Sequence, residues 1–369
     1  MSGIWWKLPG PSEFVEELAA NICNGRNMLV CLPMHSPRGL GTALRDHVGN
    51  EFAWSKEEIS SDESLNPEEY LYKIYVGDIT YGNTPNLVSL LESERFCGRV
   101  IWIEGINSLN WPSWKSFMEG YSHACRSQSL LHRTVICLCA TGFPADLPFI
   151  DDVCLSKHNF CNYVSSLDMF LYVSGQLKRK CMKDLQRKLI ASIVTNIAFW
   201  DPVVSDRLLD EGFDTILQPD SILRSIANER GWDCREVGPS WENGMKNIFD
   251  GAERMHSSAL MLFGAEREIR RRIWSAQIGV LLPFIEEKRA EIIENIGQKI
   301  KPPFRIRTCE TVQDINDVEI GQLPILLINH GIRVEQKAWR VINLLKFIRN
   351  SLAHLETLAP DTIHELLID

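Results

Sequence analysis

Short apolar runs separated by helical segments constrain the first half of this chain more than any other feature. Three of them, Asn27–Pro33 (NMLVCLP), Arg99–Glu104 (RVIWIE) and Thr134–Ala140 (TVICLCA), are rich in Val, Ile, Leu and Cys, and a further run lies around Leu71–Val76. Runs that are apolar throughout are typical of strands buried on both faces of a parallel sheet. The pattern therefore predicts an α/β fold, a parallel sheet with helices on both faces.

A loop rich in turn-forming residues, MHSPRGLG, follows the first run, and TALRDHV after it has helical character. Strand, glycine-containing loop and helix is the layout of a phosphate-binding loop, in which a Lys contacts the phosphates and a Ser or Thr holds magnesium. With Gly39 as the last glycine, Leu40 stands where the Lys belongs and Gly41 where the hydroxyl belongs, and Thr42 is one residue late. The loop predicts weak nucleotide binding at most and argues against efficient ATP hydrolysis.

Two polar residues end the later runs: Glu104, in the manner of a Walker B carboxylate, and Thr141, where a sensor residue would stand. This order resembles the additional-strand P-loop NTPases, especially the AAA+/STAND regulatory group, over about residues 11–142. Glu104 has an alternative role as a strand-end carboxylate that caps a helix, so magnesium binding stays open. The residues that the resemblance places around a nucleotide are Gly39, Gly41, Thr42, Glu104 and Thr141.

From Trp241 onward the sequence is almost wholly helical in pattern, which predicts an all-α antiparallel bundle. The expected helices are Glu266–Gln298, bent or interrupted near Pro283, then Asp314–Gly331 and Val334–Leu358, the last stopped before Pro360, with a loop at Lys301–Phe304. The expected domains are an NTPase-like α/β domain at 1–150, a helical lid or winged-helix-like region at 151–240 and the bundle at 241–369.

The last expected helix carries the sequence KFIRNSLAH at residues 346–354. Arg349, the polar Asn350 and His354 in this spacing resemble the signature of the HEPN superfamily, over about residues 241–369. The resemblance implies metal-independent cleavage of RNA by Arg349 and His354, supported by Asn350. Arg126 and His132 satisfy a looser version of the spacing, but they lead into a strand.

Helical geometry places the motif away from the apolar side of its helix. At about 100° per residue, one stripe contains Val341, Leu345, Ile348, Leu352 and Leu355. The opposite arc contains the three motif residues, the predicted substrate-binding residues Lys346, Trp339 and Asn343, and at its edge Ile342. An arc of this composition favours an interface. HEPN modules pair through this face, so the resemblance implies a homodimer through the C-terminal helical domain, with the cleft between two copies.

The chemistry of such a site follows from the residue types. RNA has a 2′-hydroxyl that attacks the neighbouring phosphate once a base removes its proton, and His354 can act as base or acid. Arg349 can hold the phosphate and stabilise the developing charge. Asn350 can orient His354, four residues further on. Cleavage would need no cofactor.

Charge and cysteine usage limit the partners and the compartment. The net charge of −9 argues against indiscriminate coating of nucleic acid, yet it permits a local basic site. Scattered cysteines without a Cys-x-x-Cys pair predict free thiols and no structural metal. No apolar stretch approaches the roughly 20 residues of a membrane span, so we expect a cytoplasmic protein without a membrane segment. The basic residues gather between positions 267 and 307, as either a site or a solvated face: Arg267, Arg270, Arg271, Arg272, Lys299, Lys301, Arg305 and Arg307.

Three functions remain open from the sequence. The leading one is an endoribonuclease controlled by the degenerate NTPase-like domain, which the resemblance places among toxins or antiviral defence effectors. The second is a non-catalytic regulatory or scaffold subunit that binds another protein, which Leu40 favours. The third is an ATPase motor or clamp loader with a helical collar, which the missing Lys disfavours.

Overall fold

The structure is a computed structural model that describes residues 2–59, 66–78, 85–149, 151–232, 238–297, 299–300, 303–307 and 310–368. Two compact units make up the chain. The sheet unit comprises Met1–Tyr172, Trp200–Pro202 and Cys234–Ala259. The helical unit comprises Val173–Phe199, Val203–Asp233 and Leu260–Asp369.

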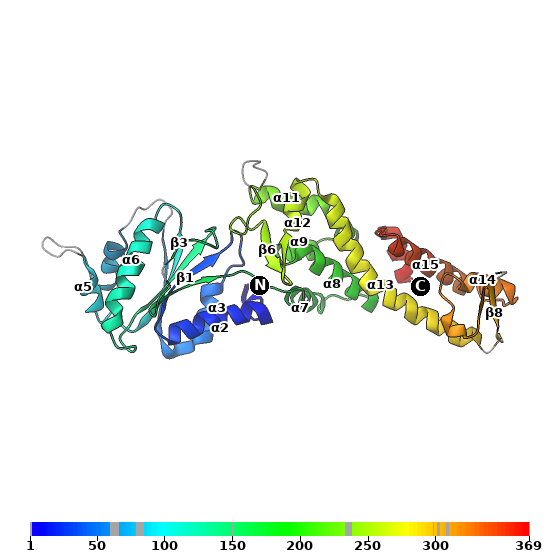
Figure 1. Cartoon of the computed structure of the whole chain (residues 1–369), viewed down its shortest axis with the longest axis horizontal. Helices are drawn as coiled ribbons and strands as arrows, with labels where there is room; N and C mark the ends of the chain where they lie inside the picture. The colour runs from blue at the N-terminus through cyan, green and yellow to red at the C-terminus, as the bar shows by residue number, and fades with distance from the viewer. Residues whose placement is uncertain are drawn as a thin grey trace. The chain divides into compact units, whose positions relative to one another are not determined.

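Five parallel strands form the main sheet of the sheet unit, in the order β2-β3-β4-β1-β5 (Figure 1). Strand β4 lies between β1 and β3, since Val30 pairs with Cys139 and Ile101 pairs with Ile136. The α/β architecture predicted from the apolar runs is confirmed. Because the strands are parallel, their carboxyl ends meet at one edge, where the glycine-containing loop and Glu104 lie. The strands are β1 (Asn27–Leu32), β2 (Ala53–Glu58), β3 (Arg99–Ile106), β4 (Val135–Thr141) and β5 (Leu155–Asn159).

The run Leu71–Val76 was wrongly predicted as a strand. It lies in helix α4 (Pro67–Tyr75), which begins with an Asn66 side chain accepting a hydrogen bond from the backbone of Glu68, 3.0 Å away. An Asn N-cap, a Pro in the first turn and acidic residues after it are strong helix-start signals. Two strands of the sheet were not predicted, β2 and β5, and the polar residues of β2 suit its edge position.

Helices cover both faces of the sheet (Figure 1). On one face, α4 and α6 (Trp111–Ala124) form a continuous apolar core with the strands, in which Leu71, Trp114 and Ile103 are fully buried. On the other face lie α2 (Pro9–Cys23) and α3 (Leu40–Val48), whose Phe14 and Leu44 are also fully buried. Each such side chain stabilises the fold by about 1.5–3 kcal/mol. Short helices complete this part of the chain: α1 (Ser2–Trp5), α5 (Leu87–Leu91), η1 (Gly49–Glu51) and η2 (Cys125–Ser127).

The region 151–240, expected to hold a lid or winged-helix-like domain, contributes β5 to the sheet, where Leu155 pairs with Asn27. The sheet therefore continues past the predicted boundary at residue 150. The rest of the described part of this region is helical. Its helices are α7 (Ser166–Leu177), α8 (Asp184–Ala198), α9 (Pro202–Asp210), α10 (Phe213–Leu217) and α11 (Asp220–Glu229).

A β-hairpin occupies the start of the region that was predicted to be helical. Strands β6 (Lys246–Phe249) and β7 (Ala252–Met255) pair in antiparallel fashion in the sheet unit. Asp250 and Gly251 between them both have positive φ, 49° and 73°. An Asp-Gly pair with two positive φ values is the favoured two-residue hairpin connection. The sequence thus carried a hairpin signal that the helical pattern concealed.

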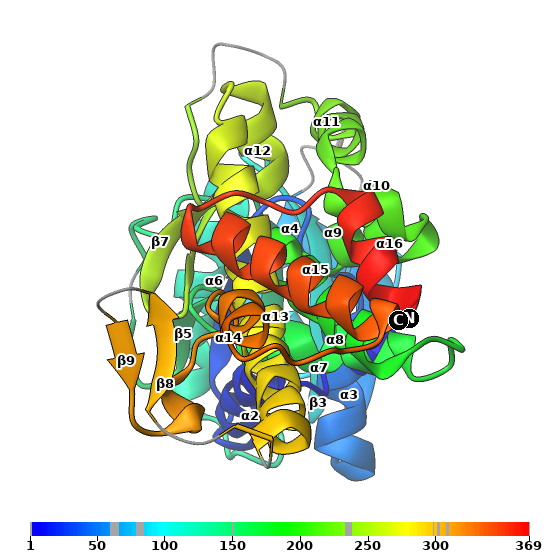
Figure 2. The same cartoon turned by 90° about the vertical axis from the view of Figure 1, so that its right-hand side faces the viewer.

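The helical unit is built on one long helix, α13 (Glu266–Gly297), which contains Pro283 and packs against α8. The prediction of an all-α bundle over 241–369 was wrong, because this region contains two β-hairpins. The second, β8 (Phe304–Arg307) and β9 (Glu310–Val312), lies beside α14 and begins where the expected loop at 301–304 ends (Figure 2). Phe304 and Ile306 point their side chains into the interior, 4% and 0% exposed, so this hairpin belongs to the core of the unit.

Three helices end the chain, and α15 lies across α13 (Figure 2). The single helix predicted over Asp314–Gly331 is a 3-10 turn followed by a shorter helix. The predicted last helix ends five residues early, at Ala353, and a further helix follows it. The elements are η3 (Ile315–Asp317), α14 (Leu323–Asn329), α15 (Gln336–Ala353) and α16 (Pro360–Ile368), after α12 (Ser257–Leu262) earlier in the chain.

Among the described residues, no helix has both the length and the apolar content needed to cross a membrane. The cysteines in that part of the chain are all free, and most of those in the sheet are buried.

Candidate functional site

The motif residues lie together at the C-terminal end of α15. Arg349 and Asn350 occupy its last turn, and His354 is the first residue after the helix. The backbone N–H of His354 donates to the carbonyl oxygens of Asn350 and Ser351, each 3.1 Å away. His354 is exposed, and among the described residues its imidazole has no hydrogen-bond partner. The imidazole is therefore open to a ligand.

The helix ends here because Leu355 adopts the left-handed conformation, with φ +62°. The Leu355 N–H donates to Leu352 and the Glu356 N–H donates to Ser351, which is the Schellman pattern of helix termination. Gly normally fills this position, because a side chain there costs about 1–2 kcal/mol. The prediction that Leu355 belongs to the buried stripe was wrong, since its side chain is 70% exposed. A strained residue thus directly follows His354.

Arg349 is held by an acidic neighbour. Its Nη2 lies 3.0 Å from Oε2 of Glu319, and its Nη1 lies 3.5 Å from Oδ1 of Asn350. The two ion-pair side chains are 37% and 60% exposed. An ion pair this exposed contributes little, about 0–1 kcal/mol, so a phosphate can replace Glu319 at modest cost.

Helix α13 anchors the segment that carries His354. The indole Nε1 of Trp274 donates to the carbonyl oxygen of Leu352, and the side-chain amide of Gln277 makes two hydrogen bonds with the backbone of Leu358. These bonds bracket residues 353–357. Neither Trp274 nor Gln277 was selected from the sequence, because their contacts lie about eighty residues away along the chain.

Two of the predicted substrate-binding residues, Trp339 and Asn343, lie away from the motif. Trp339 and Asn343 line a cavity of about 340 Å³ with Phe347 and residues of α16, whereas the half-buried Lys346 is not among its lining residues. At 1.5 Å per residue, Asn343 lies about 16 Å along the axis from His354. Ile342, expected at the edge of the outward arc, is 1% exposed and so belongs to the core.

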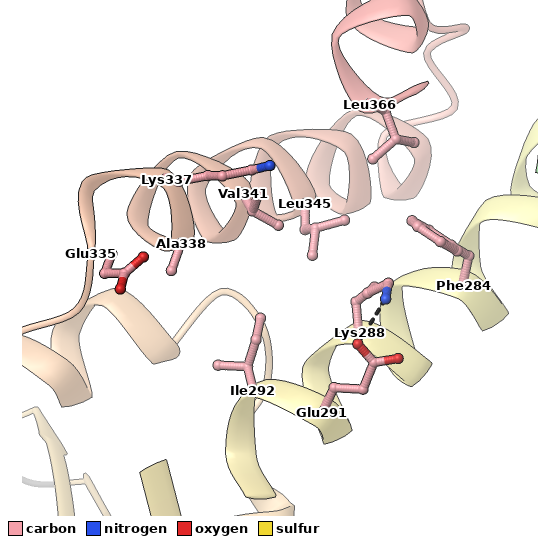
Figure 3. A pocket seen from close by; sticks show the side chains of 10 residues that line it. All are labelled: Phe284, Lys288, Glu291, Ile292, Glu335, Lys337, Ala338, Val341, Leu345 and Leu366. Atoms are coloured by element: carbon pink, nitrogen blue, oxygen red, sulfur yellow. Dashed lines mark hydrogen bonds and ion pairs between the residues drawn. The ribbon is translucent and has the colours of Figure 1, made fainter. Parts of the chain in front are cut away.

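A second cavity of about 340 Å³ separates α13 from the first half of α15 (Figure 3). Phe284 and Ile292 line it from α13, and Val341 and Leu345 line it from α15. Lys288 and Glu291 form an ion pair of 2.7 Å at its border. The residues of α15 that line this cavity belong to its first ten, so the motif at the C-terminal end of α15 is not part of it.

The loop after β1 keeps the layout of a phosphate-binding loop without its chemistry. Gly39 has φ +96° and starts α3, but Leu40, in the place of the Lys, is 3% exposed and faces the core. A Cβ atom on Gly41 would lie 2.6 Å from Nε1 of Trp102, so this glycine is needed for packing. Gly39 and Thr42 line a cavity of about 740 Å³, together with Trp6, which follows α1, and residues of α1, α2 and α3.

Glu104 is already engaged at the edge of the sheet. Its Oε2 lies 2.8 Å from Nζ of Lys56, and its Oε1 accepts a hydrogen bond of 2.8 Å from the indole of Trp102. Thr141 is exposed at the end of β4. In the part of the chain that the structure describes, no group of three or more His, Cys, Asp or Glu side chains is placed to hold a metal ion. The Glu104 carboxylate is therefore bound by Lys56 of β2 and by Trp102 of its own strand, β3.

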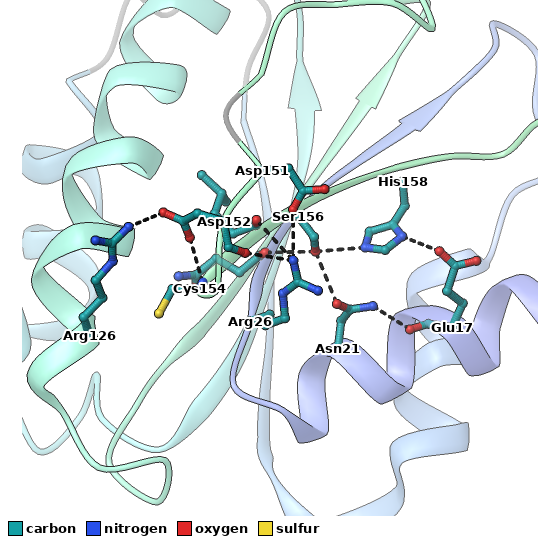
Figure 4. A network of polar contacts seen from close by, with 11 residues as sticks. Glu17, Asn21, Arg26, Arg126, Asp151, Asp152, Cys154, Ser156 and His158 are labelled. Atoms are coloured by element: carbon teal, nitrogen blue, oxygen red, sulfur yellow. Dashed lines mark hydrogen bonds and ion pairs between the residues drawn. The ribbon is translucent and has the colours of Figure 1, made fainter.

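A Ser-His-Glu arrangement that the sequence did not suggest ties α2 to the edge strand β5 (Figure 4). His158 Nε2 lies 2.9 Å from Oγ of Ser156, and its Nδ1 lies 2.6 Å from Oε1 of Glu17. The hydroxyl of Ser156 also lies 3.4 Å from the amide of Asn21. Ser156 is only 2% exposed, so a substrate does not reach this hydroxyl, and the arrangement is structural.

No family model matches this sequence, and no curated protein matches it either.

Proposed function

We propose that this chain is a metal-independent endoribonuclease of the HEPN type, regulated by a degenerate NTPase-like sheet unit. The observation that carries the proposal is the placement of Arg349, Asn350 and His354 at one accessible helix end, with the His354 imidazole open to a ligand. A histidine and an arginine in this state match the base and the phosphate-holding group that cleavage of RNA requires.

Two copies of the chain complete this site. Arg349 and His354 are five residues apart, about 7.5 Å along the helix axis, and they project at different angles. Pairing of two α15 ends brings two histidines to one phosphate. One His354 takes the proton of the 2′-hydroxyl, whose oxygen bonds to phosphorus, while the other gives a proton to the departing 5′-oxygen. The products are a 2′,3′-cyclic phosphate and a 5′-hydroxyl, and the step needs no cofactor.

The sheet unit regulates cleavage without hydrolysing a nucleotide. Its strand order supports the resemblance to the additional-strand P-loop NTPases, because β4 is an extra strand between β1 and β3. Leu40 is buried, and the Glu104 carboxylate is paired with Lys56, and both facts argue against ATP turnover. Binding of a nucleotide near Gly39 and Thr42, or of a protein partner, would then act as the signal. An RNA-cleaving cytoplasmic toxin or antiviral defence effector is the role that the two resemblances together suggest.

The test is incubation of the purified chain with tRNA and mRNA in EDTA. We expect cleavage that persists in EDTA, leaves 2′,3′-cyclic phosphate ends and is lost in His354→Ala and Arg349→Ala. His132→Ala is the matched control, because His132 is also exposed and belongs to the looser copy of the motif in the sheet unit. Cleavage that survives His354→Ala would sink the assignment.

A second candidate is a non-catalytic regulatory or scaffold subunit of a multi-protein complex. The ion pair between Arg349 and Glu319 favours it, because it gives Arg349 a structural partner within the same chain. This candidate predicts no RNA cleavage, no ATP turnover and stable co-purification with a protein partner. Cleavage by the isolated chain excludes it.

A further inference from the structure

The basic residues between positions 267 and 307 do not form one surface. Arg272 is 6% exposed, with its guanidinium 3.9 Å from the centre of the Phe199 ring. Arg267, Arg270 and Arg271 are exposed in the first two turns of α13, whereas Lys299 and Arg305 are exposed beyond its other end. The rest of α13, from Arg271 to its end at Gly297, separates the two groups, which is about 39 Å. Lys301 and the side chain of Arg307 lie outside the described residues.

The first group lies on the same stripe of α13 as the residues that contact α15. At about 100° per residue, with Trp274 at zero, Gln277 lies at about −60°, Arg270 at about −40°, Arg267 at about +20° and Arg271 at about +60°. Trp274 and Gln277 make the hydrogen bonds to Leu352 and Leu358 described above. The arginines therefore face the side of α13 on which α15 and the His354 segment lie.

These arginines continue the stripe past the end of α15. The two helices run in opposite directions, because Ile292 and Ala338 line one cavity while Trp274 contacts Leu352, near the end of α15 at Ala353. Moving back along α13 from Trp274, Arg270 lies about 6 Å away and Arg267 about 10 Å away. Helix α15 ends at Ala353, one residue after the Leu352 that Trp274 contacts, so the segment that carries His354 begins where the helix pair ends and the arginine stripe continues.

Ion pairs within the fold account for at most one of these three arginines. Neither Arg267 nor Arg270 has an ion-pair partner among the described residues, and Glu266 pairs with Arg224 at 2.6 Å. Arg271 lies 3.9 Å from Glu268 and is 77% exposed. Arg267 lies in the first turn of the helix, between Glu266 and Glu268, where the helix dipole disfavours a cation. A ligand of negative charge accounts for the three residues better than the fold does.

We propose that Arg267, Arg270 and Arg271 form a phosphate-binding strip that guides single-stranded RNA to His354. The inference rests on the proposed function, since it names the surface that delivers the substrate to that site. Arg binds phosphate through two parallel donors, and the three side chains start from about 6 Å of helix, so each of them can hold one phosphate of the strand. The net charge of −9 makes much of the remaining surface repel RNA. Binding therefore concentrates where exposed cations lie near the segment that carries His354.

The experiment measures RNA binding by fluorescence anisotropy, with a 5′-fluorescein decauridine RNA in EDTA, at 50, 100 and 200 mM NaCl. Every protein carries His354→Ala, so that the probe stays intact. The triple variant Arg267→Gln, Arg270→Gln, Arg271→Gln is compared with a control, Lys299→Gln, Arg305→Gln, which neutralises exposed cations beyond the other end of α13. Circular dichroism melts check that each variant folds.

We expect the triple variant to raise the Kd at least tenfold and to reduce the slope of log K against log salt by about 2, from 0.7 per lost phosphate contact. The control should keep the parent Kd and slope. Equal losses in both variants, or no loss in the triple variant, overturn the strip. Binding of decaglutamate, but not of RNA, through the same arginines also overturns it, in favour of an acidic protein partner.

Failure of the proposed function gives a different result. A chain that cleaves no RNA with His354 intact, yet binds the probe through the three arginines, refutes the endoribonuclease and leaves the strip standing. A chain that cleaves RNA with an unchanged Kd and slope in the triple variant refutes the strip alone.

Discussion

The indole Nε1 of Trp274 in α13 donates a hydrogen bond of 2.8 Å to the carbonyl oxygen of Leu352, in the last turn of α15. One turn further along α13, the Gln277 side chain donates to the carbonyl oxygen of Leu358 at 3.4 Å and accepts from its N–H at 2.9 Å. His354 lies between these anchors. Helix α13 thus fixes both ends of the segment that presents the candidate catalytic histidine.

Replacing Trp274 by Phe should loosen that segment, because the ring stays but the donor to Leu352 is lost. We expect the free energy of unfolding to fall by about 1 kcal/mol. The backbone amides of residues 353–358 should exchange with deuterium faster than in the parent chain. Trp339→Phe is the control, since the described residues offer its indole no hydrogen-bond acceptor. Equal exchange in the two variants would contradict a positioning role for Trp274.

Neutralising Glu319 should free Arg349 for a phosphate. Their exposed ion pair contributes at most about 1 kcal/mol, so Glu319→Gln should change stability little. RNA then no longer competes with a carboxylate for the guanidinium. We expect a KM for RNA cleavage lower by about two- to fivefold, with kcat nearly unchanged. Glu335→Gln, at an exposed acidic residue without an ion pair among the described residues, should leave the KM as it is. An unchanged KM in Glu319→Gln would mean that Arg349 does not hold the phosphate.

Restoring the Lys of a phosphate-binding loop should damage the fold instead of creating an ATPase. Leu40 is 3% exposed, so Leu40→Lys places a cation in the core between α3 and the sheet. We expect a loss of stability on the order of 3 kcal/mol in urea unfolding. Thr42→Lys, two residues further at an exposed position, should be within about 0.5 kcal/mol of the parent. New ATP turnover in Leu40→Lys at unchanged stability would show that position 40 faces a nucleotide.

The strands that the sequence predicted are the three buried on both faces of the sheet. Strands β1, β3 and β4 are the inner ones, and the middle of each is an unbroken run of buried apolar residues. The two edge strands, β2 and β5, contain polar residues such as Lys56, Lys157 and His158, so no apolar run marks them. An edge strand pairs on one side only, and polar residues protect its free side. Apolar patterning therefore finds the centre of a parallel sheet and misses its edges.

The candidate site was predictable in its residues and not in its surroundings. The spacing of Arg349, Asn350 and His354 is visible in the sequence, and the structure places all three at one helix end. The end of that helix was missed, because a leucine occupies the left-handed position where a glycine would have signalled termination. The contacts of Glu319 and Trp274 join segments distant in sequence, and no local pattern encodes them.

Stability should fall in alkaline solution through the thiol of Cys31. Burial raises the pKa of Cys31 from 9.0 to about 11. A pKa raised by folding means that the fold favours the neutral thiol, so its contribution is complete below about pH 9 and is lost as the pH rises to about 11. The loss amounts to roughly 2–3 kcal/mol. Urea unfolding between pH 8 and pH 11 should show the difference between the parent and Cys31→Ala shrinking by that amount. Val30→Ala, at a buried neighbour without a titratable group, should lower the free energy of unfolding by the same amount at every pH. If the difference between the parent and Cys31→Ala is also independent of pH, the assignment to Cys31 is refuted.

Replacing Leu355 by Gly should show whether the backbone strain at this residue affects stability alone or also the cleavage of RNA. The residue has φ +62° and a 70% exposed side chain, so Leu355→Gly removes steric strain and gives up little burial. The relief of about 1–2 kcal/mol is partly offset by the greater freedom of a glycine in the unfolded chain, which leaves a net gain of about 0.5–1 kcal/mol. Ala353→Gly, in the last helical residue, should instead lose about 0.5–1 kcal/mol. If the strain also serves to hold His354 in position, the more stable Leu355→Gly chain should cleave RNA with a lower kcat. A variant that gains stability and keeps its kcat would show that the strain has no part in the reaction.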